Sequence, residues 1–446
     1  MRARQRLKGS GLDCTDNSQV LGYPGPGVDC TPINATAALA GIDMPENDPA
    51  VQAAAVTLQG YRNGSLANAA ALPSWGTGGN PCLWHGVLCN ANLQVAALDI
   101  HGLSLSGPVP SGGLLTSFPA LSRLDLSSNL YSGTIPAADL AYLTALTYLS
   151  LANNGLGGTL PAGLTALPNL RILDLSLNAL TGSLPAVWFS GANKLGAGTV
   201  WRLSCRQCNL TGSLPAIDAG FTLQTFQVPN NQLAGSIPAF ALTDNQELDY
   251  SNNALTSNVP DFGVTIKRLY LSGNQLTGNL PYLHNMQDVR LRGNAFIGPL
   301  WTALHSGAFL LDLAYNKLSG TLPSTWSLAT NLSAVYLTSN NITGTLPMSW
   351  ADMQLSARPA VGTSTLAFHL KVLYLDGNAL AGTIPPEWAS FSPWGPNAFG
   401  CLSLVGNARL CGSLPEGMVC LNTSGTAIGA LRALCAVFGT KLTFGV

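Results

Sequence analysis

The stretch that decides the fold is Leu124-Asp-Leu126-Ser-Ser-Asn129-Leu-Tyr-Ser-Gly133-Thr-Ile135-Pro136, because copies of it recur along the 446-residue chain. In each copy an asparagine follows five residues after an apolar residue that opens a short strand pattern. Eleven asparagines share this place: Asn129, Asn154, Asn178, Asn231, Asn253, Asn274, Asn294, Asn316, Asn340, Asn378 and Asn407. A motif that recurs every 20 to 38 residues indicates a solenoid, and a solenoid presents a long surface suited to binding.

Thirteen copies of the repeat can be aligned. Their strand-opening residues are Leu98, Leu124, Leu149, Leu173, Leu203, Phe226, Leu248, Leu269, Val289, Leu311, Val335, Leu373 and Leu402. Strand alternation turns the two apolar residues of each copy inward. The asparagine also turns inward, so its amide must bond backbone groups of its own and neighbouring repeats. Leu103 and Cys208 replace the asparagine in the first and fifth copies.

The repeat form Leu-x-Gly-x-Ile/Leu-Pro resembles the plant-type extracellular leucine-rich repeats of receptor-like proteins, receptor-like kinases and polygalacturonase-inhibiting proteins. The resemblance covers roughly residues 49–420. Trp75 precedes a stretch similar to the N-terminal cap of these families, Asn80-Pro81-Cys82-Leu-Trp84-His-Gly86-Val87-Leu-Cys89. A stretch similar to their C-terminal cap is Asn407-Ala-Arg-Leu-Cys411-Gly, with Cys420 following.

The resemblance implies an α/β solenoid, a leucine-rich-repeat right-handed superhelix with a parallel β-sheet on its concave face. We expect about 13 repeats and caps closed by disulfides. The expected domains are a leader (1–48), an N-terminal cap (49–93), the repeats (94–410), and a C-terminal cap with a tail (411–446). Between Leu203 and Leu311 the repeats shorten to 20–23 residues, which leaves little room for a helix on the convex side. Insertions at 186–198 and 351–371 are surface excursions or loops that overhang one face.

Charge is scarce: 9% of residues are charged, against roughly 25% in a typical domain, and the formal net charge is −1. This composition argues against nucleic acid and anionic membrane surfaces as partners. Caps closed by cysteines imply an oxidising compartment, so we expect an extracellular protein that is secreted or held in the cell wall or at the cell surface. No signal peptide is visible near residues 1–8, and residues 427–446 suggest a capping helix or tail rather than a membrane anchor.

The ten cysteines suggest several pairings. The cap resemblance implies Cys82–Cys89 and Cys411–Cys420, whereas Cys14–Cys30 rests on proximity alone. Cys205 and Cys208 read as buried neighbours, free or bridged, rather than as a redox or metal site; Cys401 and Cys435 stay unassigned. Six Asn-x-Ser/Thr sequons are candidate glycosylation sites: Asn34, Asn63, Asn209, Asn331, Asn341 and Asn422.

The outward strand positions change character along the chain, from small and acidic residues to arginine and tyrosine. Arginine and tyrosine are enriched at binding hot spots. We therefore expect a ligand on the concave face at Arg202, Arg206, Arg268, Tyr270, Arg290, Arg292, Tyr315, Tyr336, Tyr374 and Asp376. Arg290 and Arg292 point to one face and could grip a carboxylate or sulfate, as a similar Arg-x-Arg pair does in some peptide-binding receptor ectodomains. The alternative is that the arginines form surface ion pairs with Asp249, Asp288, Asp312 and Asp376.

These features predict a recognition protein that binds a peptide, protein or glycan. One form of this prediction is a receptor ectodomain. A membrane is a partner only if a spanning segment lies outside this chain. The alternatives are a secreted inhibitor of a wall-degrading glycoside hydrolase and a structural cell-wall or matrix glycoprotein. We expect no enzyme, cofactor or metal. The five histidines are scattered, and Asp99 with His101 lacks an evident nucleophile. The sequence leaves the oligomeric state open.

Overall fold

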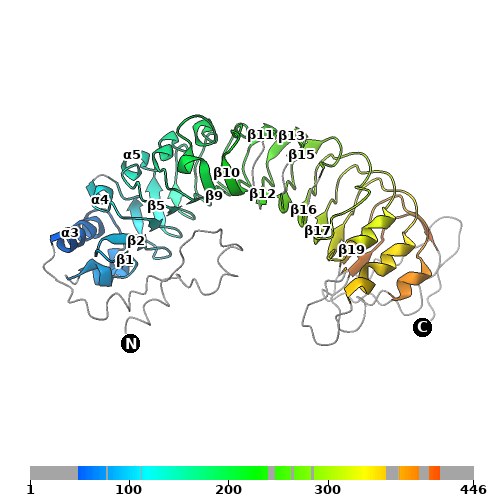
Figure 1. Cartoon of the computed structure of the whole chain (residues 1–446), viewed down its shortest axis with the longest axis horizontal. Coiled ribbons are helices and arrows are strands. Elements are labelled where there is room, and N and C mark those ends of the chain that lie inside the picture. The colour runs from blue at the N-terminus through cyan, green and yellow to red at the C-terminus, as the bar shows by residue number, and fades with distance from the viewer. Residues whose placement is uncertain are drawn as a thin grey trace. The chain divides into compact units, whose positions relative to one another are not determined.

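The computed structural model describes residues 49–76, 79–111, 113–239, 247–262, 266–282, 286–357, 370, 372–390 and 401–411. The chain divides into two compact units, residues 1–231 (unit 1) and 232–446 (unit 2). Within each unit, Figure 1 shows the strands of one main sheet along the concave side and the helices away from it.

Unit 1 begins with helix α3 (Pro49–Gly64) and the short 3₁₀ helices η1 (Ala69–Ala71), η2 (Pro73–Gly76) and η3 (Pro81–Leu83). Strand β1 (Val87–Cys89) pairs antiparallel with β2 (Val95–Asp99), and all later strands of this sheet run parallel. They are β4 (Arg123–Asp125), β6 (Tyr148–Ser150), β8 (Ile172–Asp174), β9 (Thr199–Ser204) and β10 (Thr222–Gln227).

Short elements carry the chain of unit 1 back between these strands. They are β3 (Ser106–Pro108), β5 (Leu130–Gly133), β7 (Gly155–Leu156), α4 (Gly113–Thr116), α5 (Ala137–Leu140), η4 (Ala162–Ala166), η5 (Ala186–Trp188) and η6 (Leu195–Gly198). Strands β3, β5 and β7 form a second, smaller parallel sheet beside the main one.

Unit 2 repeats this plan. Its main sheet holds β12 (Glu247–Asp249), β14 (Arg268–Tyr270), β16 (Asp288–Arg290), β17 (Leu310–Asp312), β18 (Ala334–Tyr336), β19 (Val372–Tyr374) and β21 (Cys401–Ser403), all parallel. Smaller sheets join β11 (Ala234–Ser236), β13 (Ala254–Asn258) and β15 (Gln275–Thr277), and β20 (Ala381–Thr383) with β22 (Arg409–Cys411). The helices are η7 (Ser324–Leu328), η8 (Met348–Ala357) and η9 (Pro386–Ser390).

The described part of the short repeats, from Leu203 to Leu311, contains no helix and uses extended segments instead. All thirteen strand-opening residues predicted from sequence lie within main-sheet strands. Parallel pairing sets these residues in register from repeat to repeat, as in Leu124↔Leu149 and Leu269↔Val289. Each stacks on its neighbour in the core, and most are fully buried.

The repeated asparagine lies at the end of each strand and bonds backbone groups on both sides. In the case of Asn178, Oδ1 accepts the N–H of Leu156 at 3.0 Å, and Nδ2 donates to the carbonyls of Leu151 and Leu175 at 2.9 Å and of Ser176 at 3.2 Å. Leu151 and Leu156 belong to the preceding repeat, so the side chain joins two repeats. The same pattern recurs at Asn129, Asn154, Asn231, Asn274, Asn294, Asn316, Asn340, Asn378 and Asn407. We call this series the asparagine ladder.

The N-terminal cap closes the first edge of the core. Trp75 and Trp84 stack with ring centroids 6.1 Å apart, and the Trp75 indole N–H donates to the carbonyl of His85 at 2.9 Å. The predicted Cys82–Cys89 disulfide is present. Gly86 has a φ of 74°, and a Cβ there would lie 2.0 Å from the carbonyl oxygen of Asp99. The motif therefore requires glycine at this position on both conformational and steric grounds.

A second internal column consists of tryptophans behind the strands of unit 2. Trp326, Trp350 and Trp388 are buried and stack at centroid distances of 5.8 and 6.4 Å. The indole N–H of Trp350 donates to the carbonyl of Pro323, and that of Trp388 donates to Pro347. The buried rings thus leave no indole donor unpaired, as burial of tryptophan requires.

Cys205 and Cys208 are bridged and buried, which selects one of the two alternatives that their spacing allowed. Cys208 occupies the ladder position, and its backbone N–H still meets the Oδ1 of Asn231 at 3.0 Å. Several sequence predictions fall outside the described residues: the Cys14–Cys30 pair, the Cys420 partner of Cys411, Cys435, the sequons at Asn34 and Asn422, and the C-terminal segment 412–446.

Buried side chains and hydrogen bonds hold the insertion at 186–198 against the rest of unit 1. Trp188, Phe189 and Leu195 are fully buried. An Arg171 guanidinium nitrogen donates to the carbonyls of Gly196 and Thr199 at 3.1 and 3.0 Å. Much of the insertion therefore belongs to the core of unit 1. The second insertion begins in η8, and residues 358–369 lie outside the described part of the chain. Among the described helices, none has the length and apolar character needed to cross a membrane.

We predict that Asn178→Ala destabilises the protein by at least about 3 kcal/mol, because buried backbone donors and acceptors lose their partner. Chemical denaturation with a far-ultraviolet readout measures the loss. Asn193→Ala is the matched control: Asn193 is exposed and lies in the same unit, so its replacement should change stability by about 0.5 kcal/mol or less. Equal effects of the two changes would contradict a structural role for the ladder.

Candidate functional site

The outward side chains of the main-sheet strands form what we call the strand face of each unit. In unit 2 the parallel register sets six of the central outward residues in one column: Asp249, Tyr270, Arg290, Asp312, Tyr336 and Tyr374. Neighbouring strands in a sheet lie about 4.8 Å apart, so successive side chains in this column are within contact distance. Four of the ten predicted site residues, Tyr270, Arg290, Tyr336 and Tyr374, therefore lie in one column.

Arg290 is held within this column by an acidic partner on its own strand. Its Nε and Nη2 donate to the two carboxylate oxygens of Asp288 at 3.0 and 2.9 Å. Its guanidinium carbon lies 4.8 Å from the centre of the Tyr270 ring, and the Tyr270 hydroxyl donates to the same carboxylate at 2.9 Å. These hydrogen bonds to Asp288 raise the pKa of Arg290. The charge of Arg290 is thus locally neutralised.

Arg292, two residues further, has a different environment. Its guanidinium carbon lies 4.4 Å from the centre of the Tyr315 ring, and both side chains are exposed. No Asp or Glu of the described chain lies within ion-pair distance of Arg292. A cation stacked on an aromatic ring keeps its outer N–H groups available to an anion. The two arginines of the Arg-x-Arg pair are therefore unequal.

Asp312 lies on the next strand and is half-buried. Burial raises the pKa of its carboxyl, while the N–H of Ala314 and the nearby cations Arg292 and Arg290 act in the opposite direction. Among the described residues, the Ala314 N–H is the only donor to this carboxylate, with a nitrogen-to-oxygen distance of 3.2 Å. Asp312 thus places a negative charge beside Arg292 without an ion pair.

The remaining predicted residues of unit 2 have internal partners. Arg268 pairs with Glu247 at 2.8 Å. Tyr336 and Tyr374 pack edge-on with ring centroids 5.3 Å apart. Asp376 accepts hydrogen bonds from the Ser403 hydroxyl, the Val405 N–H and the Thr338 hydroxyl, so it organises the strand ends. Of the four acidic residues predicted as ion-pair partners, Asp288 pairs with Arg290, whereas Arg268 pairs with Glu247, which was not predicted.

Arg202 and Arg206 lie in unit 1. Arg202 is half-buried on β9, and Arg206 is exposed just after it. The Arg206 Nε donates to the amide oxygen of Gln227 at 3.3 Å. The structure thus brings together members of the predicted site within unit 2, while Arg202 and Arg206 belong to unit 1.

Unit 1 also contains a charged cluster that the sequence indicated only through Asp99 and His101. The His101 Nδ1 lies 2.5 Å from Asp99, and Arg123 reaches Asp125 at 2.9 Å and Asp99 at 3.6 Å. Asp99 and Asp125 are almost fully buried, so this is more than a surface pair. Arg123 also lies over the Tyr148 ring, 3.7 Å from its centre. Burial, together with the Asp125 carboxylate, raises the pKa of Tyr148 to about 12.

Asp99, His101 and Asp125 are the described residues that could together hold a metal ion. The carboxylate of Asp125 already accepts hydrogen bonds from the Ser127 N–H and hydroxyl, from Arg123 and from the Tyr148 hydroxyl. The Ser127 hydroxyl donates to Asp125. The guanidinium of Arg123 lies 2.9 Å from Asp125 and 3.6 Å from Asp99, so the cluster forms an internal ion-pair network.

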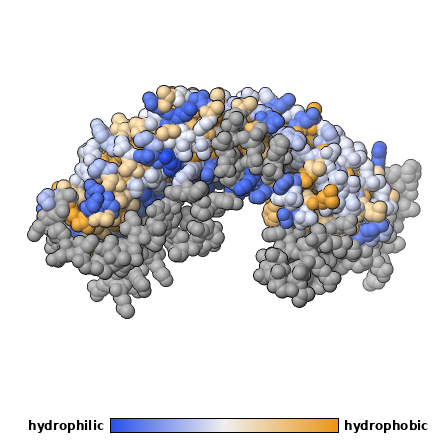
Figure 2. Space-filling model, viewed as in Figure 1, coloured by the Kyte–Doolittle hydropathy of each residue, from blue (hydrophilic) through white to orange (hydrophobic). Residues whose placement is uncertain are grey.

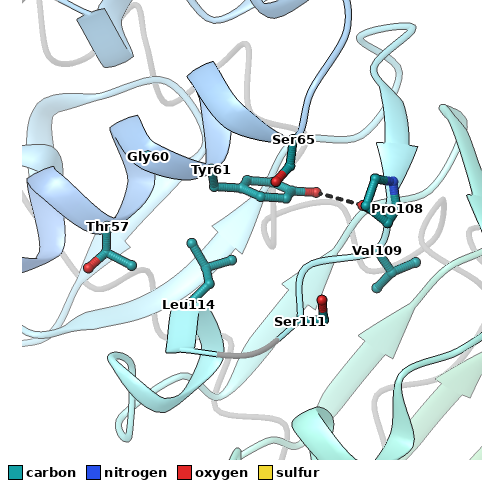
Figure 3. Close-up of a pocket in the computed structure, with 8 residues that line it drawn as sticks. All are labelled: Thr57, Gly60, Tyr61, Ser65, Pro108, Val109, Ser111 and Leu114. Carbon is teal, nitrogen blue, oxygen red and sulfur yellow. Dashed lines mark hydrogen bonds between the residues drawn. The ribbon is translucent and has the colours of Figure 1, made fainter.

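A shallow pocket of about 250 Å³ lies between the cap helix α3 and the first repeat. Figure 3 shows Tyr61 reaching from the helix towards Pro108, whose carbonyl accepts the tyrosine hydroxyl at 3.2 Å. Thr57, Leu114 and Ser111 complete the rim. The pocket brings together no charged residue. In the view of Figure 2, hydrophilic and hydrophobic residues alternate over the coloured surface.

Comparison with known proteins agrees with this architecture. A leucine rich repeat N-terminal domain matches residues 55–90, and leucine rich repeats match residues 145–167, 166–183, 265–286 and 369–391. Receptor-like protein 18 of Arabidopsis thaliana is 30% identical over 245 residues, which cover 50% of this chain and 26% of that protein. The chain spans about a quarter of the length of the receptor-like proteins it matches.

Two solved structures are similar. A crystal structure titled PEPR1-AtPEP1 has a TM-score of 0.63 and 28% identity, covering 75% of this chain and 45% of that one. The Arabidopsis receptor kinase HAESA ectodomain, in complex with an IDA peptide hormone ligand, has a TM-score of 0.50 and 24% identity over 83% of this chain and 71% of that one. The second similarity shows the fold alone. The chain thus carries leucine-rich repeats and an N-terminal cap that resemble those of plant receptor-like proteins and receptor kinases.

We predict that Arg123→Gln lowers the free energy of unfolding by about 1–3 kcal/mol at pH 7, because two neighbouring carboxylates lose their shared cation. Arg123→Lys keeps a positive charge at this position, so its loss should be smaller. Denaturant titrations of the parent and both variants test this. Equal losses for Arg123→Gln and Arg123→Lys would show that the charge of Arg123 contributes little.

Proposed function

We propose that this chain is the ligand-recognition part of an extracellular leucine-rich-repeat protein. Its ligand is a peptide or protein that presents an anionic group to the strand face of unit 2. The observation that carries the proposal is the exposed guanidinium of Arg292, stacked on Tyr315 and without an acidic partner in the described chain. The other two arginines of this face, Arg268 and Arg290, are both paired with acidic residues.

The neighbouring residues support this role. The side chains of Tyr270 and Arg290 are held by hydrogen bonds to the carboxylate of Asp288. Arg290 precedes Arg292 by two residues, so this group is next to Arg292 on the strand face. Rigid aromatic and arginine side chains lose little conformational entropy on binding, which favours them in recognition surfaces. An incoming carboxylate could accept two N–H bonds from the guanidinium of Arg292, a geometry that lysine does not offer.

The similar proteins support the class of ligand. The HAESA ectodomain is described with a peptide hormone, and PEPR1 with AtPEP1. The matched relatives are receptor-like proteins, which favours the cell surface over the alternatives of an enzyme inhibitor or a structural wall protein. Since the chain spans only part of these relatives, its partners and location are part of the proposal.

We predict that Arg292→Ala weakens binding at least tenfold, because a charged partner lost from an interface typically costs about 2–5 kcal/mol. Ligands are selected from a random peptide library with free carboxyl termini, and calorimetry then measures affinity. The Arg290→Ala/Arg292→Ala double variant should lose about two- to fivefold more than the single one, since Arg290→Ala leaves the Asp288 carboxylate without its cation. Melting temperatures should stay nearly unchanged for both.

Lys317→Ala is the control for general charge, because Lys317 is an exposed cation next to a ladder asparagine, off the strand face. It should bind as the parent does. If the selected peptides bind Arg292→Ala and the parent equally well, Arg292 is only a surface feature and the site is wrong.

Asp312→Asn gives a test of opposite sign. Removing this negative charge beside Arg292 should strengthen the binding of an anionic ligand by about two- to fivefold, in line with the roughly 0.2–1 kcal/mol of partly exposed charge pairs. Calorimetry with the same peptides measures it. Weaker binding would show that the ligand instead presents a donor or a cation to Asp312.

A further inference from the structure

Four of the six sequons lie in the described part of the chain, and the asparagine of each is exposed: Asn63, Asn209, Asn331 and Asn341. None of the four lies in a main-sheet strand. Two of them, Asn209 and Asn341, occupy the same place in their repeats, one residue after the ladder position.

The fold directs both of these side chains outward. Asn341 stands between the buried Asn340 and Ile342, and its backbone N–H is fixed to the carbonyl of Leu318 at 2.7 Å. Asn209 stands between Cys208 and Leu210, which are both fully buried. With both neighbours directed into the core, the intervening side chain must point away from it. Neither side-chain amide bonds another described residue.

The adjacent repeats leave room at this place. The equivalent residue is Ala179 in the repeat before Asn209 and Ala379 in the repeat after Asn341. Like the backbone N–H of Asn341, the backbone N–H of each alanine donates to a carbonyl of the preceding repeat. Lys317 precedes Asn341 in this column, and it is exposed and flexible. The hydroxyl residues of the two sequons, Thr211 and Thr343, are also exposed.

We propose that Asn209 and Asn341 are N-glycosylation sites whose glycans point away from the core and leave the strand face of their unit bare. The modification joins the side-chain nitrogen of asparagine to the anomeric carbon of an oligosaccharide. The bond from that carbon to the diphosphate of a lipid-linked donor breaks, the diphosphate leaves with the bonding electrons, and the amide gives up one proton. The proposal rests on the extracellular location proposed above and is independent of the ligand at Arg292.

The test expresses the whole chain behind a secretory leader in plant cells and maps the secreted, folded protein by glycopeptide mass spectrometry. We expect glycan on Asn209 and Asn341 in most molecules. Thr211→Ala and Thr343→Ala should each remove one glycan, and Thr211→Ser and Thr343→Ser are matched controls that keep the sequon and should keep the glycan.

Two outcomes would overturn the proposal. One is a secreted, folded parent protein in which both asparagines are unmodified. The other is an occupied site at which the glycan persists after the Thr→Ala change, which would place the glycan on another residue. Because the controls keep the hydroxyl, including the bond from Thr343 to the carbonyl of Gly320, a folding defect in an alanine variant is distinguishable from loss of the sequon.

Discussion

The fold depends on the need to satisfy backbone groups where each strand turns into the return segment. No strand pairing reaches these groups, yet they are buried, and an unpaired buried donor or acceptor costs about 1–3 kcal/mol. One asparagine per repeat solves the problem, because its amide offers both an acceptor and two donors. Asn178 shows the solution most clearly, with one accepted and three donated bonds. The leucines can stack in register only because these turns are held at a constant geometry.

Only 9% of the residues are charged, and several of these charges form ion pairs. Arg123 pairs with Asp99 and Asp125, Arg268 with Glu247, and Arg290 with Asp288. On the strand face of unit 2, Arg292 differs from Arg268 and Arg290 because it is stacked on Tyr315 instead. The significance of Arg292 comes from this contrast with its two neighbours on the same face.

Sequence alone predicted the strands and the ladder, because these depend on a local pattern that repeats, and the resemblance of the cap motif predicted the Cys82–Cys89 bridge. It predicted that Arg290 and Arg292 share a face, since that follows from strand alternation. It did not predict their inequality, which depends on Asp288 lying on the same strand as Arg290 and on Tyr315 lying one repeat beyond Arg292. Nor did it predict the tryptophan stack behind the strands or the Arg123 network, because both join residues of different repeats through side-chain packing that no short motif records.

The central claim is that the ladder amides are structural bonds of the folded state, and amide hydrogen exchange of the unmodified protein tests it most directly. The backbone N–H groups of Leu105, Leu156, Leu276, Leu318 and Leu380 each bond a ladder asparagine oxygen and lie outside the main-sheet strands. The account predicts that they exchange as slowly as the amides of the main-sheet strands, because both are released only by unfolding. Exchange as fast as that of exposed loop amides would contradict it.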